Sequence, residues 1–183
     1  MHIFFSEEAI STGLACLSQG FCSSYARRNR DEVRRTTGPD ELGSEAEGRI
    51  RDALRARLDD EDDEVRSLSA FALTGLGDPV AVPELLGIAM TGPRDIEAAE
   101  ALADFVIGGS DAAEEIMARL RLAAGSPRMI ERFRALQVLM EIPDGHLGAV
   151  TDLLVRLAHD ENPEVAATAA AELRRRRDGP PRR

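Results

Sequence analysis

The chain has 183 residues and a formal net charge of −10, and all 23 of its basic residues are arginine. A surface this acidic is unsuited to holding phosphates, so nucleic acid is not expected as the main partner. No apolar run approaches the roughly 20 residues of a membrane span, and Glu7 and Glu8 interrupt the apolar start that a signal peptide would need. We therefore expect a cytoplasmic protein with a protein partner and no membrane association.

Alanine and leucine supply most of the apolar surface, whereas aromatic residues make up only 4% of the chain. Both alanine and leucine favour helices, and alanine lets helices approach each other closely. The composition therefore predicts an all-α fold with small residues where the helices meet.

The first 44 residues predict a degenerate helical repeat or a cap. Ile10, Leu14 and Leu17 have the spacing of one helix face, and this helix would begin near Ser6. A second helix would be cut short before Pro39. Terminal units of repeat arrays are often atypical, because one of their sides faces water.

A short sequence pattern is repeated along the chain. The tetrapeptide Asp31-Glu32-Val33-Arg34 recurs as Asp63-Glu64-Val65-Arg66, and weaker copies follow. A β-branched residue anchors each copy at spacings of 32, 31, 34 and 35 residues, which is typical of stacked helix pairs. We therefore expect about four helix pairs in residues 45–177, followed by a disordered basic tail in residues 178–183. The five anchors are Val33, Val65, Ile96, Ile130 and Val165.

The copy around Val65 has the clearest pattern. Two apolar stripes at helical spacing are separated by the acidic turn at residues 59–64. Asp62 or Asp63 is placed to cap the second helix, and Gly77 is placed for a left-handed stop after it. The anchor Val65 is expected to be buried between helices. The first stripe holds Ile50, Ala53, Leu54 and Leu58, and the second holds Val65, Leu68, Ala72, Leu73 and Leu76.

The later copies follow the same order of helix, turn and helix. The anchors Ile96, Ile130 and Val165 are expected on the apolar faces of their second helices. The last apolar residue of the final helix is Leu173, and the arginine-rich segment 174–183 is expected to fray.

Residues 58–86, LDDEDDEVRSLSAFALTGLGDPVAVPELL, resemble the short HEAT-like repeats of bacteria, which are also found in phycobilin lyases. The match is specific over residues 50–90, moderate over 150–176 and weak over 91–145, and the first 40 residues depart from it. The matching positions are Asp60, Val65, Arg66, Ala72, Leu73, Gly77, Asp78, Pro79, Ala81, Val82, Pro83 and Leu85.

The resemblance implies a right-handed α-solenoid of antiparallel helix pairs, with the second helix of each pair on the concave side. It also implies a structural ladder of Asp–Arg contacts between units, for which Asp60 and Arg66 occupy the matching positions. Arg34 matches the Arg position of the first copy. We expect the ladder to be interrupted, because other residues occupy the later Arg positions, namely Glu97, Glu131 and Ala166.

Candidate catalytic and metal-binding residues do not gather in the sequence. The three histidines are isolated, and none is followed by the glutamate that would resemble the pairs of iron-binding hydroxylases built on such repeats. Cys16 and Cys22 are expected to be buried apolar thiols. The acidic run at 59–64 lacks the alternating ligands and the glycine of a calcium loop. We therefore expect no catalytic residue, no metal and no cofactor.

The remaining candidate is the surface of the second helices. If these helices line the concave side, that face is mainly acidic and favours a basic protein partner. We therefore expect a non-catalytic scaffold or adaptor, and the alternatives are a lyase-like or enzyme-associated module and a self-assembling repeat protein. The candidate protein-binding residues are Glu97, Glu100, Asp104, Arg134, Gln137, Glu141, Glu164 and Glu172.

Overall fold

The computed structural model describes residues 41–109, 111–143 and 148–179. The regular secondary structure of these residues consists of α-helices and short 3-10 helices joined by turns. The predictions for Ser6, Cys16 and Cys22 fall outside the described residues. The elements are α3 (Glu41–Ala56), η1 (Arg57–Asp59), α4 (Asp63–Gly75), η2 (Pro79–Ala81), α5 (Val82–Thr91), α6 (Asp95–Ile107), α7 (Ala112–Ala124), α8 (Met129–Glu141), α9 (Gly148–Leu157) and α10 (Pro163–Asp178).

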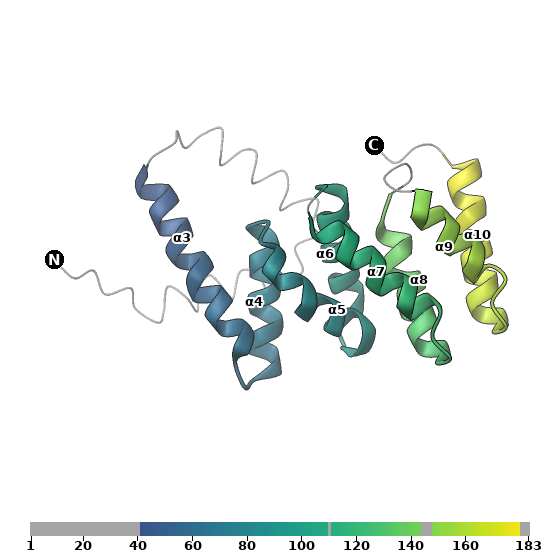
Figure 1. The fold of residues 1–183 in the computed structure, drawn as a ribbon, viewed down its shortest axis with the longest axis horizontal. Coiled ribbons are helices and arrows are strands. Elements are labelled where there is room, and N and C mark those ends of the chain that lie inside the picture. Colours follow the sequence, from purple (N-terminus) through teal and green to yellow (C-terminus); the bar gives the residue numbers. More distant parts are fainter. Residues whose placement is uncertain (1–40, 110, 144–147, 180–183) are drawn as a thin grey trace.

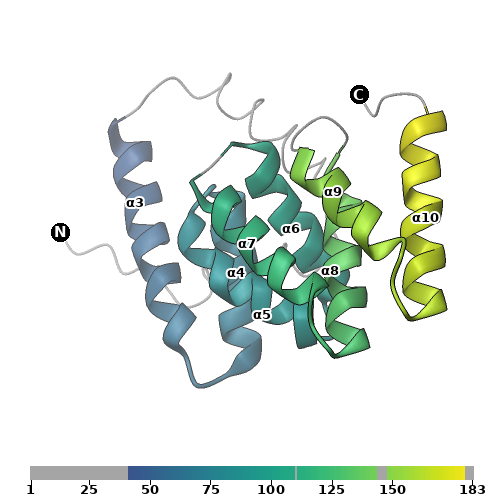
Figure 2. The ribbon, with the colours of Figure 1, turned by 45° about the vertical axis from the view of Figure 1, so that its right-hand side comes forward.

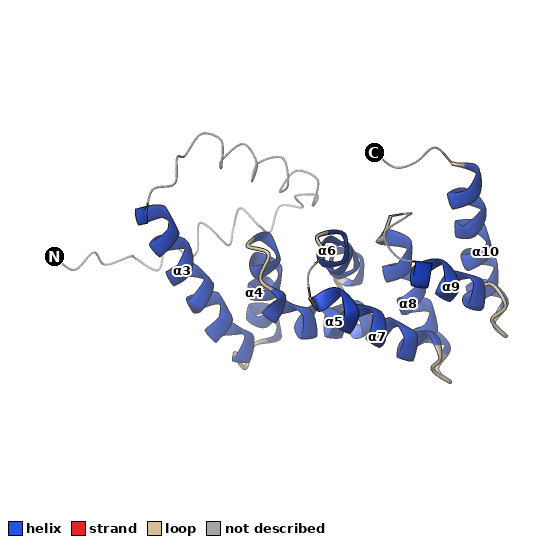
Figure 3. Cartoon of the chain, turned by 45° about the horizontal axis from the view of Figure 1, so that its top comes forward, coloured by secondary structure: helices blue, strands red, loops and turns tan. Residues whose placement is uncertain are grey.

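The described helices pack in four successive pairs, α3–α4, α5–α6, α7–α8 and α9–α10. The second helices α4, α6, α8 and α10 contact one another in order, and so do the first helices α5, α7 and α9. The pairs follow one another along the long axis of the molecule (Figure 1), with α3 and α10 at opposite ends in the turned view (Figure 2). Short loops join the helices (Figure 3).

Small residues lie where the second helices meet the core. The seventh residue of each of three second helices is a buried alanine, namely Ala101, Ala135 and Ala169. Ser69 occupies the same position in α4 and is also buried. These side chains allow close helix contacts, as the alanine content predicted. Leucines fill the remaining space, including Leu73, Leu85, Leu102, Leu120, Leu136, Leu139, Leu154 and Leu157.

Short-range signals determine where the second helices begin and end. The Asp62 carboxylate accepts hydrogen bonds from the backbone N–H groups of Glu64 and Val65, so Asp62 is the predicted cap of α4. Asn162 caps α10 in the same way. Gly77 has φ +67°, which confirms the left-handed residue predicted after α4.

Two of the predicted anchors lie on the solvent-exposed faces of their helices, and not on the faces that pack against the core. Ile96 is 59% exposed and Ile130 is 44% exposed, although both were expected to face inward. Helices α6 and α8 begin after Arg94 and Arg128, so the residues equivalent to Val65 are Glu97 and Glu131. By helix position, the anchors of these two copies lie one residue later than the β-branched pattern predicts.

The copy with the clearest sequence pattern is also less buried than predicted. Val65 is half-buried, and Ile50, assigned to the inward stripe of the preceding helix, is 55% exposed. Leu54 and Leu58 do pack against the core. Leu73 of α4 is fully buried, as predicted, and the other buried residues of this helix are Ser69 and Ala70.

Arginine side chains make contacts at the turns and helix ends where successive helix pairs meet. Asp78 lies in the corner between the first two described pairs, where its buried carboxylate accepts a hydrogen bond of 2.8 Å from Arg55 Nε in α3. At the other end of the array, Arg176 of α10 donates to the carbonyls of Leu139 and Ile142 at the end of α8, at 2.8 and 2.9 Å. These contacts satisfy carbonyls that a helix end leaves without a partner.

The expectation that the arginine-rich segment frays is wrong for residues 174–178. Helix α10 continues through them to Asp178, and only residues 180–183 fall outside the described part. The helix extends because Arg175 and Arg176 fold back onto Glu172 one turn earlier.

The packing predicts a large difference between two leucines. Leu102 of α6 is fully buried, whereas Leu122 of α7 is 71% exposed. Leu102→Ala should lower the free energy of unfolding by about 2–5 kcal/mol, because it leaves a cavity between helices. Leu122→Ala should change it by less than about 0.5 kcal/mol. Urea denaturation followed by circular dichroism measures both, and equal effects would contradict this packing.

Candidate functional site

The exposed side of α6 carries three carboxylates. Glu97, Glu100 and Asp104 are spaced i, i+3 and i+7, which places them on one helix face. The opposite face carries Ala98, Leu102 and further buried residues. The structure therefore places these three predicted binding residues together, as their spacing requires.

The neighbouring helix α8 presents Arg134, Gln137 and Glu141 at the same spacing. Arg134 forms an ion pair with Asp95 in the first turn of α6, and its Nη1 lies 3.4 Å from Gln137 Oε1. Its charge is thus balanced within the protein. Arg134 therefore ties α8 to α6, while Gln137 contacts Arg134 within α8.

Glu141 ends α8 next to the acidic side of α6, and we call Glu97, Glu100, Asp104 and Glu141 the acidic cluster. Burial raises the pKa of Glu100, and the charges of Glu141, Asp104 and Glu97 raise it further. Among the described residues, no arginine pairs with Glu100 or Glu141. The cluster therefore holds a concentrated negative charge.

One edge of the acidic cluster is neutralised by Arg94. This side chain pairs with Glu97, and its guanidinium lies over the Phe71 ring of α4, 4.3 Å from the ring centre. A cation over an aromatic face is stabilised by the ring quadrupole. Arg94 therefore links α4 to α6 and leaves the negative charge centred on Glu100 and Glu141.

The two residues predicted on α10 have different environments. Glu164 is exposed in the first turn, as expected. Glu172 is buried and therefore does not belong to the exposed face, which corrects the prediction. Burial raises the pKa of Glu172, but hydrogen bonds from Arg175 and Arg176 outweigh this effect and leave the pKa below its ordinary value. Glu172 holds the end of α10 together.

The predicted ladder residues meet through the backbone. Arg66 Nη1 donates to the carbonyls of Asp60 and Glu61 at 2.8 and 3.2 Å, and its Nη2 pairs with Asp63. The Asp60 carboxylate accepts instead from Arg57 Nη1 and from the backbone N–H of Asp62, each at 3.1 Å. Arg66 therefore stabilises its own turn, and its Nε also lies 3.7 Å from Glu84 Oε1 of α5.

A complete Arg–Asp contact between helix pairs lies further along the chain. Arg132 of α8 donates to both oxygens of Asp160, at 2.7 and 2.9 Å, and both side chains are buried. These hydrogen bonds hold the pKa of Asp160 below its ordinary value, against the opposing effect of burial. The expectation that the fourth copy lacks this arginine is wrong, because the equivalent position is Arg132 and not Glu131.

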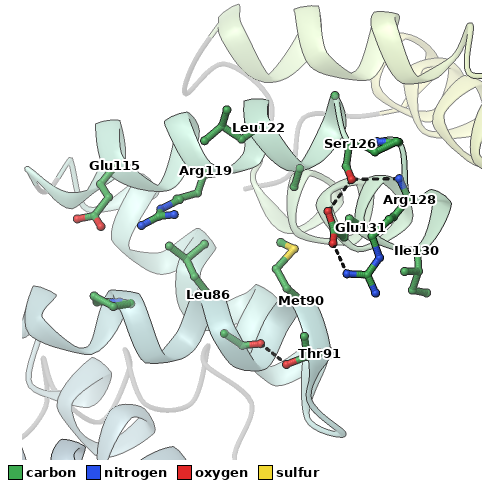
Figure 4. Close-up of a pocket in the computed structure, with 15 residues that line it drawn as sticks. Leu86, Met90, Thr91, Glu115, Arg119, Leu122, Ser126, Arg128, Ile130 and Glu131 are labelled. Atoms are coloured by element: carbon green, nitrogen blue, oxygen red, sulfur yellow. Dashed lines mark hydrogen bonds and ion pairs between the residues drawn. The ribbon is translucent and has the colours of Figure 1, made fainter.

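A second surface feature is a groove of about 690 Å³ between α5, α7 and the start of α8 (Figure 4). Leu86 and Met90 of α5 face Leu122 of α7 across it, and Ile130 borders it. Leu122 and Ile130 are 71% and 44% exposed, so this groove presents apolar side chains to solvent.

Polar groups stiffen one wall of the groove. Ser126 Oγ donates to Glu131 Oε2 at 2.6 Å and accepts from the backbone N–H of Arg128. The Arg128 side chain closes the network on Glu131 at 2.8 Å. Sequence reasoning missed this groove, because it arises from packing between two first helices. The exposed positions of Leu122 and Ile130 in the helical pattern were the available signal.

Among the described residues, no group of three His, Cys, Asp or Glu side chains is arranged to hold a metal ion. None of the described helices is both long enough and apolar enough to cross a bilayer. Comparison with protein-family models, with curated proteins and with solved structures finds no match. The possible roles of the acidic cluster and of the groove are therefore inferred from the chemistry of their own residues.

The acidic cluster predicts that removal of one of its charges raises the thermal stability of the fold in a pH-dependent way. Because the pKa of folded Glu100 is raised, this residue destabilises the fold as the pH rises above the ordinary glutamate value of about 4.3. Glu100→Gln relieves two like-charge contacts along α6, worth about 0.5–1 kcal/mol together, and should raise the Tm at pH 7 by about 1–4 °C.

Thermal unfolding at pH 7 and at pH 4 tests this prediction. The gain should be largest at pH 7 and should shrink at pH 4, where the folded wild-type protein already carries a proton on Glu100. Asp152→Asn, which removes an exposed charge from the middle of α9, serves as the control and should leave the Tm nearly unchanged. A gain of equal size at both pH values would show that charge repulsion is not its cause.

Proposed function

We propose that this chain is a non-catalytic scaffold or adaptor, built as a right-handed α-solenoid of HEAT-like repeats, and that it binds a basic segment of a protein partner. The order of the helix pairs supports the solenoid, since second helices contact second helices along the array. The resemblance of residues 58–86 to HEAT-like repeats supports the same reading.

The acidic cluster is the observation that carries the binding proposal. Glu100 and Glu141 come from two neighbouring second helices, so a ligand that spans both would contact successive repeats. A lysine or arginine side chain placed there would relieve the repulsion that raises the pKa of Glu100.

The apolar groove favours a second, additional role in binding. Its volume suits one or two apolar side chains of a partner segment, and Leu122 and Ile130 would be covered by them. The groove lies against the first helices α5 and α7, and the acidic cluster lies on the second helices. The two surfaces can therefore be tested separately.

Charge reversal tests the role of the acidic cluster. The double variant Glu100→Lys with Glu141→Lys should weaken binding of a fluorescently labelled lysine-rich peptide by roughly tenfold or more, because attraction becomes repulsion. Fluorescence anisotropy at low salt measures the affinity, which should fall as salt is added.

The matched control reverses two exposed charges on first helices, Glu114→Lys and Asp152→Lys. It changes the net charge by the same amount, so any loss of binding through net charge alone appears in both variants. Binding reduced to the same extent in both would contradict a specific role for the acidic cluster. Binding unchanged in both would contradict it as well.

A further inference from the structure

The groove between α5 and α7 is bordered by one face of each helix. Residues spaced i, i+4 and i+7 lie on the same face of a helix, and the lining residues of both helices have this spacing. Each face extends over about two turns, or roughly 12 Å. A trough between two helices is the shape in which an amphipathic helix of another protein binds. The lining residues include Pro83, Leu86, Gly87 and Met90 on α5 and Glu115, Arg119, Leu122 and Ala123 on α7.

Gly87 lies in the middle of α5, where glycine is less favourable than alanine. A Cβ atom placed on Gly87 would have no atom within 4 Å outside the backbone of its own helix, so packing within the described chain does not require a glycine here. A glycine does let another backbone approach closely. Gly87 therefore provides a place in the groove where a partner helix can cross α5 in close contact.

Arg119 is an unpaired cation in the same groove. Figure 4 shows its side chain extending from α7 toward α5, and within the described part of the chain it makes no hydrogen bond or ion pair. The other arginine of the groove, Arg128, is already paired with Glu131. A carboxylate of a partner therefore finds a guanidinium with free N–H donors. Glu115 lies one turn before Arg119 and disfavours a carboxylate at that end of the groove.

We propose that the groove binds an amphipathic helix of a protein partner, which crosses α5 at Gly87, covers Leu122 with apolar side chains and places a carboxylate on Arg119. This assignment rests on the binding role proposed for the groove, and its partner is distinct from the basic segment proposed for the acidic cluster. A second copy of the chain fits less well. A stable dimer buries about 800 Å² on each partner, whereas the exposed large apolar side chains among the described lining residues are Leu122 and Ile130.

A library of helical peptides displayed on phage is the probe for this groove. It is selected on the full-length wild-type protein and, in parallel, on Leu122→Asp, which changes an exposed side chain and leaves the core intact. Peptides enriched on the wild type alone should carry apolar residues at i and i+3 or i+4, with an aspartate or glutamate within one turn of them. The absence of peptides that depend on Leu122 would overturn the proposal. Peptides that depend on Leu122 but carry lysine or arginine in place of the acidic residue would overturn it too.

One enriched peptide, synthesised with a fluorescent label, then tests Gly87. Gly87→Ala should raise the midpoint of urea unfolding, because alanine favours the helix and its methyl group meets no neighbouring side chain. The same variant should weaken peptide binding by at least about fivefold, because the methyl group occupies space that the partner helix needs. Fluorescence anisotropy measures the affinity, and a more stable protein that binds less tightly cannot owe its loss of binding to unfolding.

Gly48→Ala is the matched control, since Gly48 lies inside α3 and its Cβ would also meet no atom within 4 Å. This variant should be stabilised in the same way and should bind the peptide as the wild type does. Equal affinities of Gly87→Ala and the wild type would overturn the proposal. A mass by light scattering that doubles with concentration, but stays that of a monomer in Leu122→Asp, would assign the groove to a second copy and overturn it as well.

The lysine-rich peptide distinguishes this groove from the acidic cluster. At 0.15 M salt, where charges more than about 8 Å apart are screened, an excess of it should not displace the enriched peptide. Displacement would place both peptides on one surface and overturn the proposal. A failure of the role proposed for the acidic cluster shows instead as binding of the lysine-rich peptide that does not depend on Glu100 and Glu141, so the two failures are distinguishable.

Discussion

Arginine side chains satisfy the backbone carbonyls that the ends and turns of the second helices leave without partners. Arg66 and Arg132 each donate to two carbonyls of their own turn, and Arg176 donates to two at the end of α8. A buried carbonyl without a donor costs about 1–3 kcal/mol, so these arginine donors stabilise the close stacking of the helix pairs that they join. The five N–H groups of a guanidinium allow one side chain to bind a turn and a neighbouring carboxylate together.

The same constraint separates structural charges from those free to bind a partner. Arg134 is occupied by Asp95, and Glu172 is occupied by Arg175 and Arg176, so these charges hold helices together. Glu100 and Glu141 have no such arginine among the described residues, and burial together with the charges of Glu141, Asp104 and Glu97 raises the pKa of Glu100. Binding of a cation to such a surface relieves the repulsion and lowers the free energy of the complex. This is the physical basis of the proposed binding role.

Local features of the fold could be predicted from the sequence, and contacts between helix pairs could not. The Asp62 cap and the Gly77 stop depend on neighbouring residues, and both are present. The ion pair of Arg132 with Asp160 joins residues 28 apart. The sequence pattern places the anchor at Ile130 and so does not identify Arg132, because α8 begins without a capping side chain and Ile130 faces solvent. Glu172 resembled a surface residue because its partners on the next turn were assigned to a frayed tail.

The most direct test of this account is the stability of wild-type protein and of Asp160→Asn as the pH falls from 7 to 3. The variant can still accept from the backbone N–H of Asn162, but it loses the charge that binds Arg132. Since the pKa of folded Asp160 is lowered, its contribution is present above the ordinary aspartate value of about 3.9 and is lost as the pH falls through the folded value. The account predicts that the variant is clearly less stable at pH 7 and that the difference shrinks toward pH 3. A difference that is absent at pH 7, or that stays constant over this range, would contradict it.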